Sequence, residues 1–229
     1  MPRSDMGRYV LNSGRHMIEL FGRDVIGRLA PTGYDSDEIQ LLPDEAALVG
    51  SAVSKRRREF AVGRSLARGL LAEIGIPPAP LLRDADRCPI WPEQIVGSIS
   101  HSSELCAVVV TRSDRLRGVG IDVESDQPLE KNLRDRICLA AEIDGLDEDA
   151  AGSRGKLLFS IKEAIYKCQF PISRTRFDFH DVEVELDLER QRFCGAIRVA
   201  SAASLTAAVI HGGYTWQAGH VFCAAELPV

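Results

Sequence analysis

The order in which helical and strand-like segments follow one another is the feature that most constrains the fold of this chain. Residues 43–75 are rich in Ala, Leu and Arg with apolar residues at helical spacing, which predicts one helix or two nearly continuous helices. A proline-rich loop follows over 77–92. Short β-branched runs then predict strands at 95–100, 105–112 and 118–124.

The rest of the chain repeats this order of helices and then strands. Helical patterns cover 129–141 and 154–170, and we expect Pro171 to end the second helix. Near the N-terminus, 17–21 and 25–30 are candidate edge strands. The C-terminal strand-like runs are 181–188, 193–200, 205–211 and 214–227. This order favours an α+β fold of two halves, 1–115 and 116–229, over strict βαβ alternation.

Length and composition limit the location and class of the protein. The 229 residues, 45% of them apolar, can bury a core without disulfides or a structural metal. No apolar run approaches the roughly 20 residues that a membrane helix needs. Charges interrupt the first thirty residues, so no signal peptide is predicted and we expect a cytoplasmic protein. The six cysteines form no C-x-x-C pair, and we expect them to be reduced and to bind no metal.

The uneven distribution of charge indicates an anionic ligand. The net charge of −5 argues against bulk binding of nucleic acid or anionic membrane. The segment 54–68 nevertheless holds six basic residues and one acid, with Phe60 as its single aromatic residue. Arginine side chains match phosphate oxygens bidentately, and Arg64 lies beside the apolar stripe of this helix. The alternatives are a solvated basic face or nonspecific nucleic-acid binding.

The segment GVGIDVES, 118–125, places two carboxylates on one face of a predicted strand. Because side chains alternate along a strand, Asp122 and Glu124 share a face with Gly120. Carboxylates placed so close raise each other's pKa unless a cation neutralises them. A hard divalent ion such as Mg²⁺ takes carboxylate and phosphate oxygens. The competing interpretation is an amphipathic edge strand with its polar face in water.

The segment FSIKEAIYK, 159–167, places Glu163 between Lys162 and Lys167 on a predicted helix. Taken alone, the Glu163–Lys167 spacing also fits a surface salt bridge worth a few tenths of a kcal/mol. Apolar residues surround these charges on most sides, so part of the set is expected near the core, where charge is normally paired. Glu163 is therefore a candidate for a third metal ligand or a general base, and the lysines for phosphate neutralisation. His101, between Ser100 and Ser102, is either a structural histidine or a phosphate donor.

Four segments in this order, RRREFAVGR, PIWPEQIVGSISHS, GVGIDVE and FSIKEAIYK, resemble the 4′-phosphopantetheinyl transferases. The likeness is to the bacterial subgroup typified by the enterobactin-synthase component and by actinobacterial enzymes of polyketide and nonribosomal peptide pathways. It covers residues 55–170, the middle half of the chain. Phe159 stands where the family often has Trp, which concerns local packing and not metal binding.

The resemblance implies a monomer of two similar halves related by a pseudo-twofold axis, with coenzyme A in the cleft between them. It implies Mg²⁺, with Mn²⁺ possible, bound by Asp122, Glu124 and Glu163. Glu163 and Lys167 would be catalytic. The implied contacts to coenzyme A come from basic and hydroxyl side chains, with Arg83 as the alternative to Arg87 in the same loop: Arg56, Arg64, Arg87, Ser100, His101, Lys162 and Lys167.

The reaction implied is transfer of 4′-phosphopantetheine from coenzyme A to a serine of an apo acyl or peptidyl carrier protein, releasing 3′,5′-ADP. Fatty-acid, polyketide and peptide carriers stay open, as do antibiotic and siderophore pathways. One alternative is a Mg²⁺-dependent phosphodiesterase acting on a nucleotide, since three carboxylates and basic residues also describe such sites. Another is a noncatalytic module that binds nucleotides or acidic carrier helices through 54–68.

Overall fold

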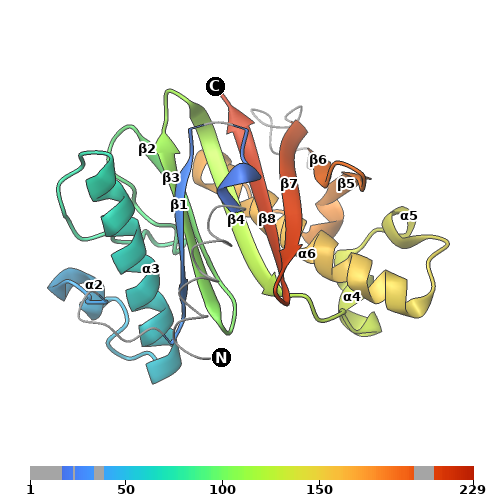
Figure 1. The fold of residues 1–229 in the computed structure, drawn as a ribbon, viewed down its shortest axis with the longest axis horizontal. Helices are drawn as coiled ribbons and strands as arrows, with labels where there is room; N and C mark the ends of the chain where they lie inside the picture. Colours follow the sequence, from blue (N-terminus) through green and yellow to red (C-terminus); the bar gives the residue numbers. More distant parts are fainter. Residues whose placement is uncertain (1–16, 23, 34–38, 199–208) are drawn as a thin grey trace.

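Two antiparallel sheets, each covered by one long helix, make up the protein in a computed structural model that describes residues 17–22, 24–33, 39–198 and 209–229 (Figure 1). The first sheet has the strand order β1-β3-β2 and lies against helix α3, Ser54–Glu73. Its strands are β1 Ile26–Pro31, β2 Ile95–His101 and β3 Leu105–Arg112.

The second sheet has the strand order β4-β8-β7-β6-β5 and lies against helix α6, Glu148–Ser173 (Figure 1). Its strands are β4 Leu116–Ser125, β5 Val182–Asp187, β6 Arg192–Ile197, β7 Val209–Gln217 and β8 His220–Pro228. The shorter helices are α2 Pro43–Ala47, α4 Lys131–Ile137, α5 Ala140–Ile143 and the 3-10 turn η1 Phe179–Asp181.

Three apolar clusters hold these layers together. One lies between α3 and the first sheet and contains Leu70 and Val108, and another lies between α6 and the second sheet and contains Ile161 and Val221. The third joins the two sheets themselves. The helices therefore cover the faces of the sheets that do not face each other.

A seam between β2 and β4 joins the two sheets. The backbone N–H of Ile121 donates to Ser98 Oγ at 3.1 Å, and the N–H of Val123 donates to Ser100 Oγ at 3.3 Å. Serine hydroxyls thus take the place of a backbone ladder here. Polar groups of both halves consequently meet inside the molecule at this seam.

Gly120 sets the position of β4 against α6. A Cβ at this position would lie 1.9 Å from the carbonyl oxygen of Ala164, which no side chain could tolerate. The absence of a side chain lets the strand backbone approach the helix. This contact brings Asp122, two residues further on, to the face of α6.

The structure confirms the α+β class and the central strands but corrects several element boundaries. Residues 17–19 are helical, so the edge strand expected at 17–21 is wrong. Of the two possibilities for 43–75, one helix or two nearly continuous helices, the structure has two, α2 and α3, while the single helix expected over 129–141 is divided into α4 and α5. Pro171 lies inside α6, which ends two residues later at Ser173, because a proline in the last turn interrupts the hydrogen bonds of a single turn only.

The last hairpin is also displaced from its expected place. The Gly212–Gly213 pair lies within β7, where a Cβ on Gly212 would lie 2.1 Å from the carbonyl oxygen of Ala224. The turn falls instead at Ala218 and Gly219, which have φ of 45° and 80°, as a tight hairpin requires. The expected strand at 205–211 falls in part outside the described residues.

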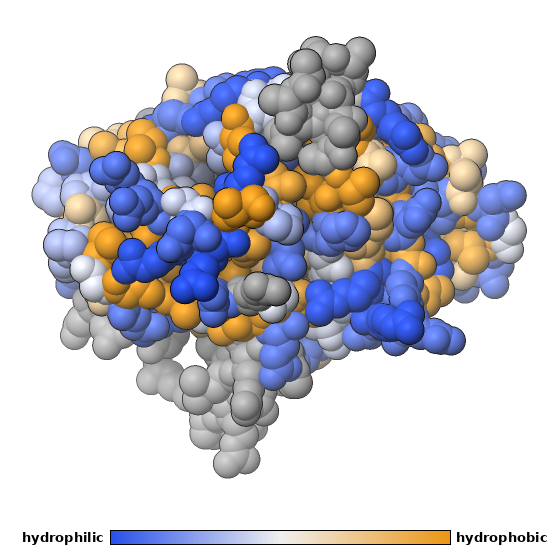
Figure 2. All heavy atoms as spheres, turned by 90° about the horizontal axis from the view of Figure 1, so that it is seen from above, coloured by the Kyte–Doolittle hydropathy of each residue, from blue (hydrophilic) through white to orange (hydrophobic). Residues whose placement is uncertain are grey.

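Among the residues that the structure describes, the surface shows no single feature that indicates a function as the polar seam does. In the view of Figure 2, polar and apolar side chains alternate in small areas over the coloured residues. Within the described part of the chain, no helix is long and apolar enough to cross a bilayer. All six cysteines are free thiols in the structure. The pseudo-twofold relation of the halves and the monomeric state stay predictions.

Candidate active site

Asp122 of β4 is the centre of a polar cluster at the seam. Its carboxylate is almost fully buried, and each of its oxygens accepts hydrogen bonds. Oδ1 accepts from Lys167 Nζ at 2.5 Å and from Ser100 Oγ at 2.9 Å, and Oδ2 accepts from Ser160 Oγ at 2.8 Å. Lys167 Nζ also donates to Ser100 Oγ at 3.0 Å. β2, β4 and α6 each contribute to this cluster.

Glu124 and Glu163 place further negative charge beside Asp122. Burial, followed by the charge of Asp122, raises the pKa of Glu124, although Lys156 Nζ lies 3.5 Å from its Oε2. Burial also raises the pKa of Glu163, aided by Asp122 and Glu124 and opposed by Lys167. Burial and the neighbouring carboxylates thus disfavour the charged forms of Glu124 and Glu163, and added positive charge would stabilise them.

This donor set fits a divalent cation by its chemistry and its electrostatics. Carboxylate oxygens are the ligands of hard cations, and a cation would favour the charged forms of Glu124 and Glu163, whose pKa values are raised first by burial and further by neighbouring carboxylates. As the side chains lie, no group of three or more His, Cys, Asp or Glu residues in the described ranges is arranged to hold a metal ion. The Lys167 ammonium neutralises Asp122 in this arrangement.

The basic residues of α3 form a second group, close to the loop that follows the helix. The Arg64 guanidinium stacks 4.2 Å from the ring centroid of Phe60, and its Nε donates to the Leu81 carbonyl oxygen at 2.7 Å. Burial lowers the pKa of Arg64 to about 10, assisted by the charges of Arg83 and Arg56 and opposed by Glu45. Arg64 and Arg83 lie against the Phe60 ring, and Arg56 adds a third positive charge that acts on Arg64, so this group suits an anion.

His101 connects the arginine group to the Asp122 cluster. Its Nε2 lies 2.5 Å from Arg56 Nη1, and its Nδ1 lies 3.8 Å from Glu59 Oε2. Burial lowers the pKa of His101, with Arg56 and Lys167 acting in the same direction against Glu59 and Asp122. Because arginine can only donate, Nε2 is the acceptor in this contact. A neutral imidazole at pH 7 is therefore the form that the structure favours.

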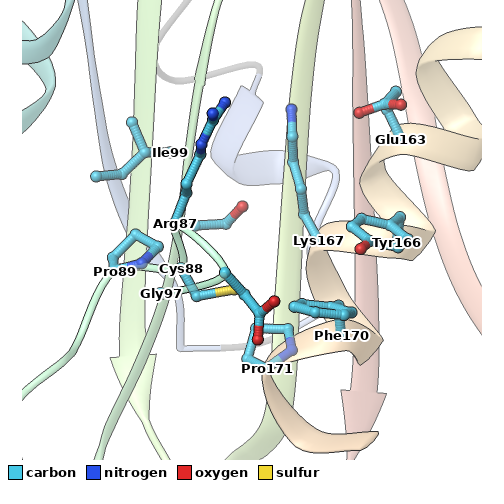
Figure 3. A pocket seen from close by; sticks show the side chains of 12 residues that line it. Arg87, Cys88, Pro89, Gly97, Ile99, Glu163, Tyr166, Lys167, Phe170 and Pro171 are labelled. Atoms are coloured by element: carbon cyan, nitrogen blue, oxygen red, sulfur yellow. The ribbon is translucent and has the colours of Figure 1, made fainter. Parts of the chain in front are cut away.

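Arg87 belongs to a different wall of the site. It lies at the tip of the loop after α3 and lines a pocket of about 250 Å³ together with Glu163, Tyr166 and Lys167. Figure 3 shows the side chains of Arg87 and Lys167 extending side by side toward the same end of this pocket. The competing candidate Arg83 points elsewhere, donating to the Leu48 carbonyl oxygen at 3.0 Å and lying 5.9 Å from the Phe60 ring.

Lys162 is the one expected phosphate contact that the structure holds in another environment. Its Nζ donates to the Ile137 carbonyl oxygen at 2.9 Å, to Glu142 Oε2 at 2.9 Å and to the Phe179 carbonyl oxygen at 3.0 Å. The ammonium has three N–H groups, and these three acceptors use all of them. Its side chain is fully buried.

Sequence reasoning missed two polar side chains of this region. Ser160 precedes Glu163 by three residues and Lys167 by seven, so all three lie on one face of a helix, and this spacing could have identified it. Tyr166 lines the pocket beside Glu163, but its spacing also fits the buried apolar stripe of α6.

The buried Asp122 and the half-buried Glu124 and Glu163 lie beside lysine side chains, next to a pocket that Arg87 also lines, and this site is suited to phosphate-group transfer. The sequence matches agree with this class. Residues 44–111 match the 4′-phosphopantetheinyl transferase N-terminal domain, and residues 118–223 match the 4′-phosphopantetheinyl transferase superfamily. These matches reach beyond the range 55–170 covered by the motifs.

Individual relatives are similar over most of their length. The 4′-phosphopantetheinyl transferase PptT of Mycobacterium tuberculosis is 37% identical over 156 residues, 67% of this chain and 69% of the relative. The 4′-phosphopantetheinyl transferase Svp of Streptomyces mobaraensis is 35% identical over 173 residues, 73% of this chain and 70% of the relative. Enterobactin synthase component D of Escherichia coli is 33% identical over 141 residues, 60% of this chain and 66% of the relative. The chain belongs to the 4′-phosphopantetheinyl transferase superfamily and is an enzyme of that class.

Proposed function

We propose that the protein transfers the 4′-phosphopantetheine group of coenzyme A to a serine hydroxyl of an apo acyl or peptidyl carrier protein. The serine Oγ bonds to the β-phosphorus of coenzyme A, and the bond from that phosphorus to the bridging oxygen breaks. The products are the phosphopantetheinyl carrier and 3′,5′-ADP. The observation that carries this proposal is the meeting of Asp122, Glu163 and Lys167 beside a pocket at the seam.

Lys167 and the arginines bind and orient the phosphates. Phosphoryl transfer demands positioning and charge stabilisation more than covalent chemistry from the protein. Lys167 and Arg87 extend toward one end of the pocket, where they suit the pyrophosphate (Figure 3). Arg56, Arg64 and His101 suit the 3′-phosphate, and we add Arg83 to this group because its charge acts on Arg64. Ser100 fixes the Lys167 ammonium.

Glu163 accepts the proton of the carrier serine. A general base works best when its pKa approaches the operating pH, and burial among other carboxylates raises the pKa of Glu163 in that direction. Lys167, one helical turn further on, stabilises charge on the leaving phosphate. Lys162 stands apart from this chemistry in our proposal and supports the fold around α6.

Asp122, Glu124 and Glu163 would hold a divalent cation, Mg²⁺ or Mn²⁺. When bound, the ion supplies positive charge to the pyrophosphate oxygens. Thermal denaturation checks binding without reference to activity. We expect Mg²⁺ to raise the melting temperature of the wild type and to leave that of Asp122→Asn unchanged, and an equal response of both proteins would contradict this ligand set.

The decisive experiment incubates the protein with coenzyme A, Mg²⁺ and an apo carrier protein and then measures the mass of the carrier. A gain of about 340 Da, the mass of the phosphopantetheine group, shows transfer because the group stays covalently bound. Breakdown of coenzyme A without any carrier would instead indicate the phosphodiesterase. Binding of coenzyme A without chemistry would indicate a noncatalytic module. Fatty-acid, polyketide and peptide carriers tested in parallel identify the substrate class.

A further inference from the structure

A short hairpin carries Arg87 to the pocket. Arg83 and Pro89 pair in an antiparallel bridge, and the N–H of Asp84 donates to the Cys88 carbonyl oxygen at 2.9 Å. Asp84 Oδ1 accepts from the N–H of Cys88 at 2.9 Å and so closes the turn from inside. Arg87 has a φ of 69°, a left-handed conformation that non-glycine residues adopt only where the surroundings hold them in it.

Two ion pairs connect this hairpin tip to the segment that follows α6. Arg174 Nη1 lies 2.5 Å from Asp84 Oδ2, and Arg176 Nη2 lies 2.6 Å from Asp86 Oδ1. Arg174 also lies 3.9 Å from Asp86. Aspartates two residues apart on one segment thus meet arginines two residues apart on another, ninety positions away in sequence.

The arginines of these pairs are themselves held in place by α6. Arg174 is the residue that ends the helix, in a left-handed conformation with φ of 56°, and its N–H donates to the Phe170 carbonyl oxygen at 2.9 Å. The guanidinium groups of Arg174 and Arg176 lie 5.8 and 6.0 Å from the Phe170 ring centroid. Phe170 in turn lines the pocket (Figure 3).

The ion pairs therefore join the hairpin and the end of α6, the two segments that form opposite walls of the pocket that Arg87 and Lys167 share. Asp86, Arg87 and Cys88 line it from the hairpin, while Lys167 and Phe170 line it from α6. We propose that Asp84–Arg174 and Asp86–Arg176 form a latch between the two halves, which fixes the hairpin tip against α6 and positions Arg87 for the phosphates of coenzyme A. This inference rests on the proposed function. A side chain that is already fixed loses less conformational entropy when its ligand binds, so the latch strengthens binding of coenzyme A.

Paired variants test the latch by its effect on binding and turnover separately. Arg174→Gln/Arg176→Gln removes both positive charges, and we expect KM for coenzyme A to rise about threefold to tenfold with kcat unchanged, as the loss of two part-exposed pairs implies. Arg198→Gln is the control, because it removes another exposed arginine–carboxylate pair, between Glu183 of β5 and Arg198, the residue that follows β6. An unchanged KM in the latch variant, or an equal rise in the control, would overturn the proposal.

A double-mutant cycle tests whether each pair acts as a unit. Asp84→Asn keeps the Oδ1 acceptor that closes the turn and removes only the charge facing Arg174. We expect Asp84→Asn/Arg174→Gln to raise KM no more than the larger single change. Fully additive effects on KM would show that the two residues act separately and would contradict the latch.

Hydrogen–deuterium exchange of residues 83–90 gives a readout that needs no turnover. We expect faster exchange at the tip in Arg174→Gln/Arg176→Gln than in the wild type, in the absence of coenzyme A. Equal exchange in both proteins would contradict the latch, whatever the reaction catalysed. Failure of the wild type to modify any carrier would refute the proposed function, whereas normal transfer with an unresponsive tip would refute the latch alone.

Discussion

Two lysines of α6 form ion pairs with carboxylates of other elements, and the two pairs differ in how far they are closed off from solvent. The closed pair, Lys162–Glu142, has its carboxylate and ammonium entirely within protein, and Glu142 also accepts the N–H groups of Leu139 and Val184. The open pair, Lys167–Asp122, joins a buried carboxylate to an ammonium whose side chain keeps 26% of its exposure. Lys162 is saturated by three acceptors, whereas the structure gives Lys167 two acceptors among the described residues.

The difference shows how one helix divides structural and chemical work. The acceptors of Lys162 come from α4, α5 and η1, so the closed pair joins small elements to α6. The acceptors of Lys167 come from β2 and β4, so the open pair lies where the two halves meet and faces the pocket. An ammonium group that keeps a free N–H at a pocket can bind a ligand, whereas one whose N–H groups all have protein acceptors can only stabilise the fold.

The largest expected effect is on kcat and concerns Glu163, which lies near the open pair. Glu163→Gln removes the proposed base with little change in shape, and we expect kcat to fall about a hundredfold to ten-thousandfold. Calorimetric binding of coenzyme A in the absence of Mg²⁺ should stay within about twofold of wild type, because the cation that Glu163 would help to hold then contributes to neither protein and Gln fills the same space. Turnover close to wild type would show that Glu163 is not the general base.

Breaking the closed pair should lower the stability of the protein and leave binding of coenzyme A unchanged. Lys162→Met leaves Glu142 charged and buried, and we expect the free energy of unfolding, measured in urea, to fall by about 3–5 kcal/mol. Adding Glu142→Gln should restore part of this loss, since Gln keeps an acceptor for the neighbouring N–H groups without the charge. KM for coenzyme A should be unchanged in the folded variant, and a large rise would show that Lys162 reaches the phosphates after all.

Sequence alone predicted what depends on local periodicity. Strand alternation put Asp122 and Glu124 on one face, and the observed β4 bears both toward α6, where Lys167 and Lys156 meet them. The same reasoning treated Lys162 and Lys167 alike, because both flank Glu163 and both suit phosphate. What separates them is the distant Glu142, and no local pattern reveals that partner.

The loop after α3 shows a second limit of sequence reasoning. Arg83 and Arg87 lie four residues apart in a segment without regular periodicity, and only the hairpin geometry sends one to Phe60 and the other to the pocket. The expected strands 205–211 and 214–227 likewise leave Gly212 and Gly213 between them, although the small size of this pair serves close packing within β7. In each case tertiary packing decides between uses that the sequence allows equally.

A smaller change in binding is expected from the lysine of the open pair. Lys167→Met removes a charged donor at the pocket, and we expect KM for coenzyme A to rise about tenfold to a hundredfold. Unfolding in urea should change less than in Lys162→Met, because Asp122 keeps the hydroxyls of Ser100 and Ser160. If Lys167→Met were the more destabilised variant, the contrast between an open and a closed pair would fail.

The smallest effect, and the most selective, concerns the pKa of His101. Burial lowers this pKa below the ordinary 6.5, and the charge of Lys167 contributes to the lowering. We therefore expect Lys167→Met to raise the pKa of His101 and Lys162→Met to leave it unchanged, as followed by NMR titration with His101→Gln to assign the signal.

The lowered pKa of His101 also makes the free energy of unfolding depend on pH. Because the folded state binds the proton of His101 less readily than the unfolded state, the free energy of unfolding falls as the pH drops below 6.5 toward the lowered folded value. Lys167→Met should make this decline shallower, and His101→Gln should remove the contribution of His101. An equal shift of the pKa of His101 in both lysine variants would mean that the closed pair also acts on the seam, and the division of α6 into a structural and a chemical region would then be wrong.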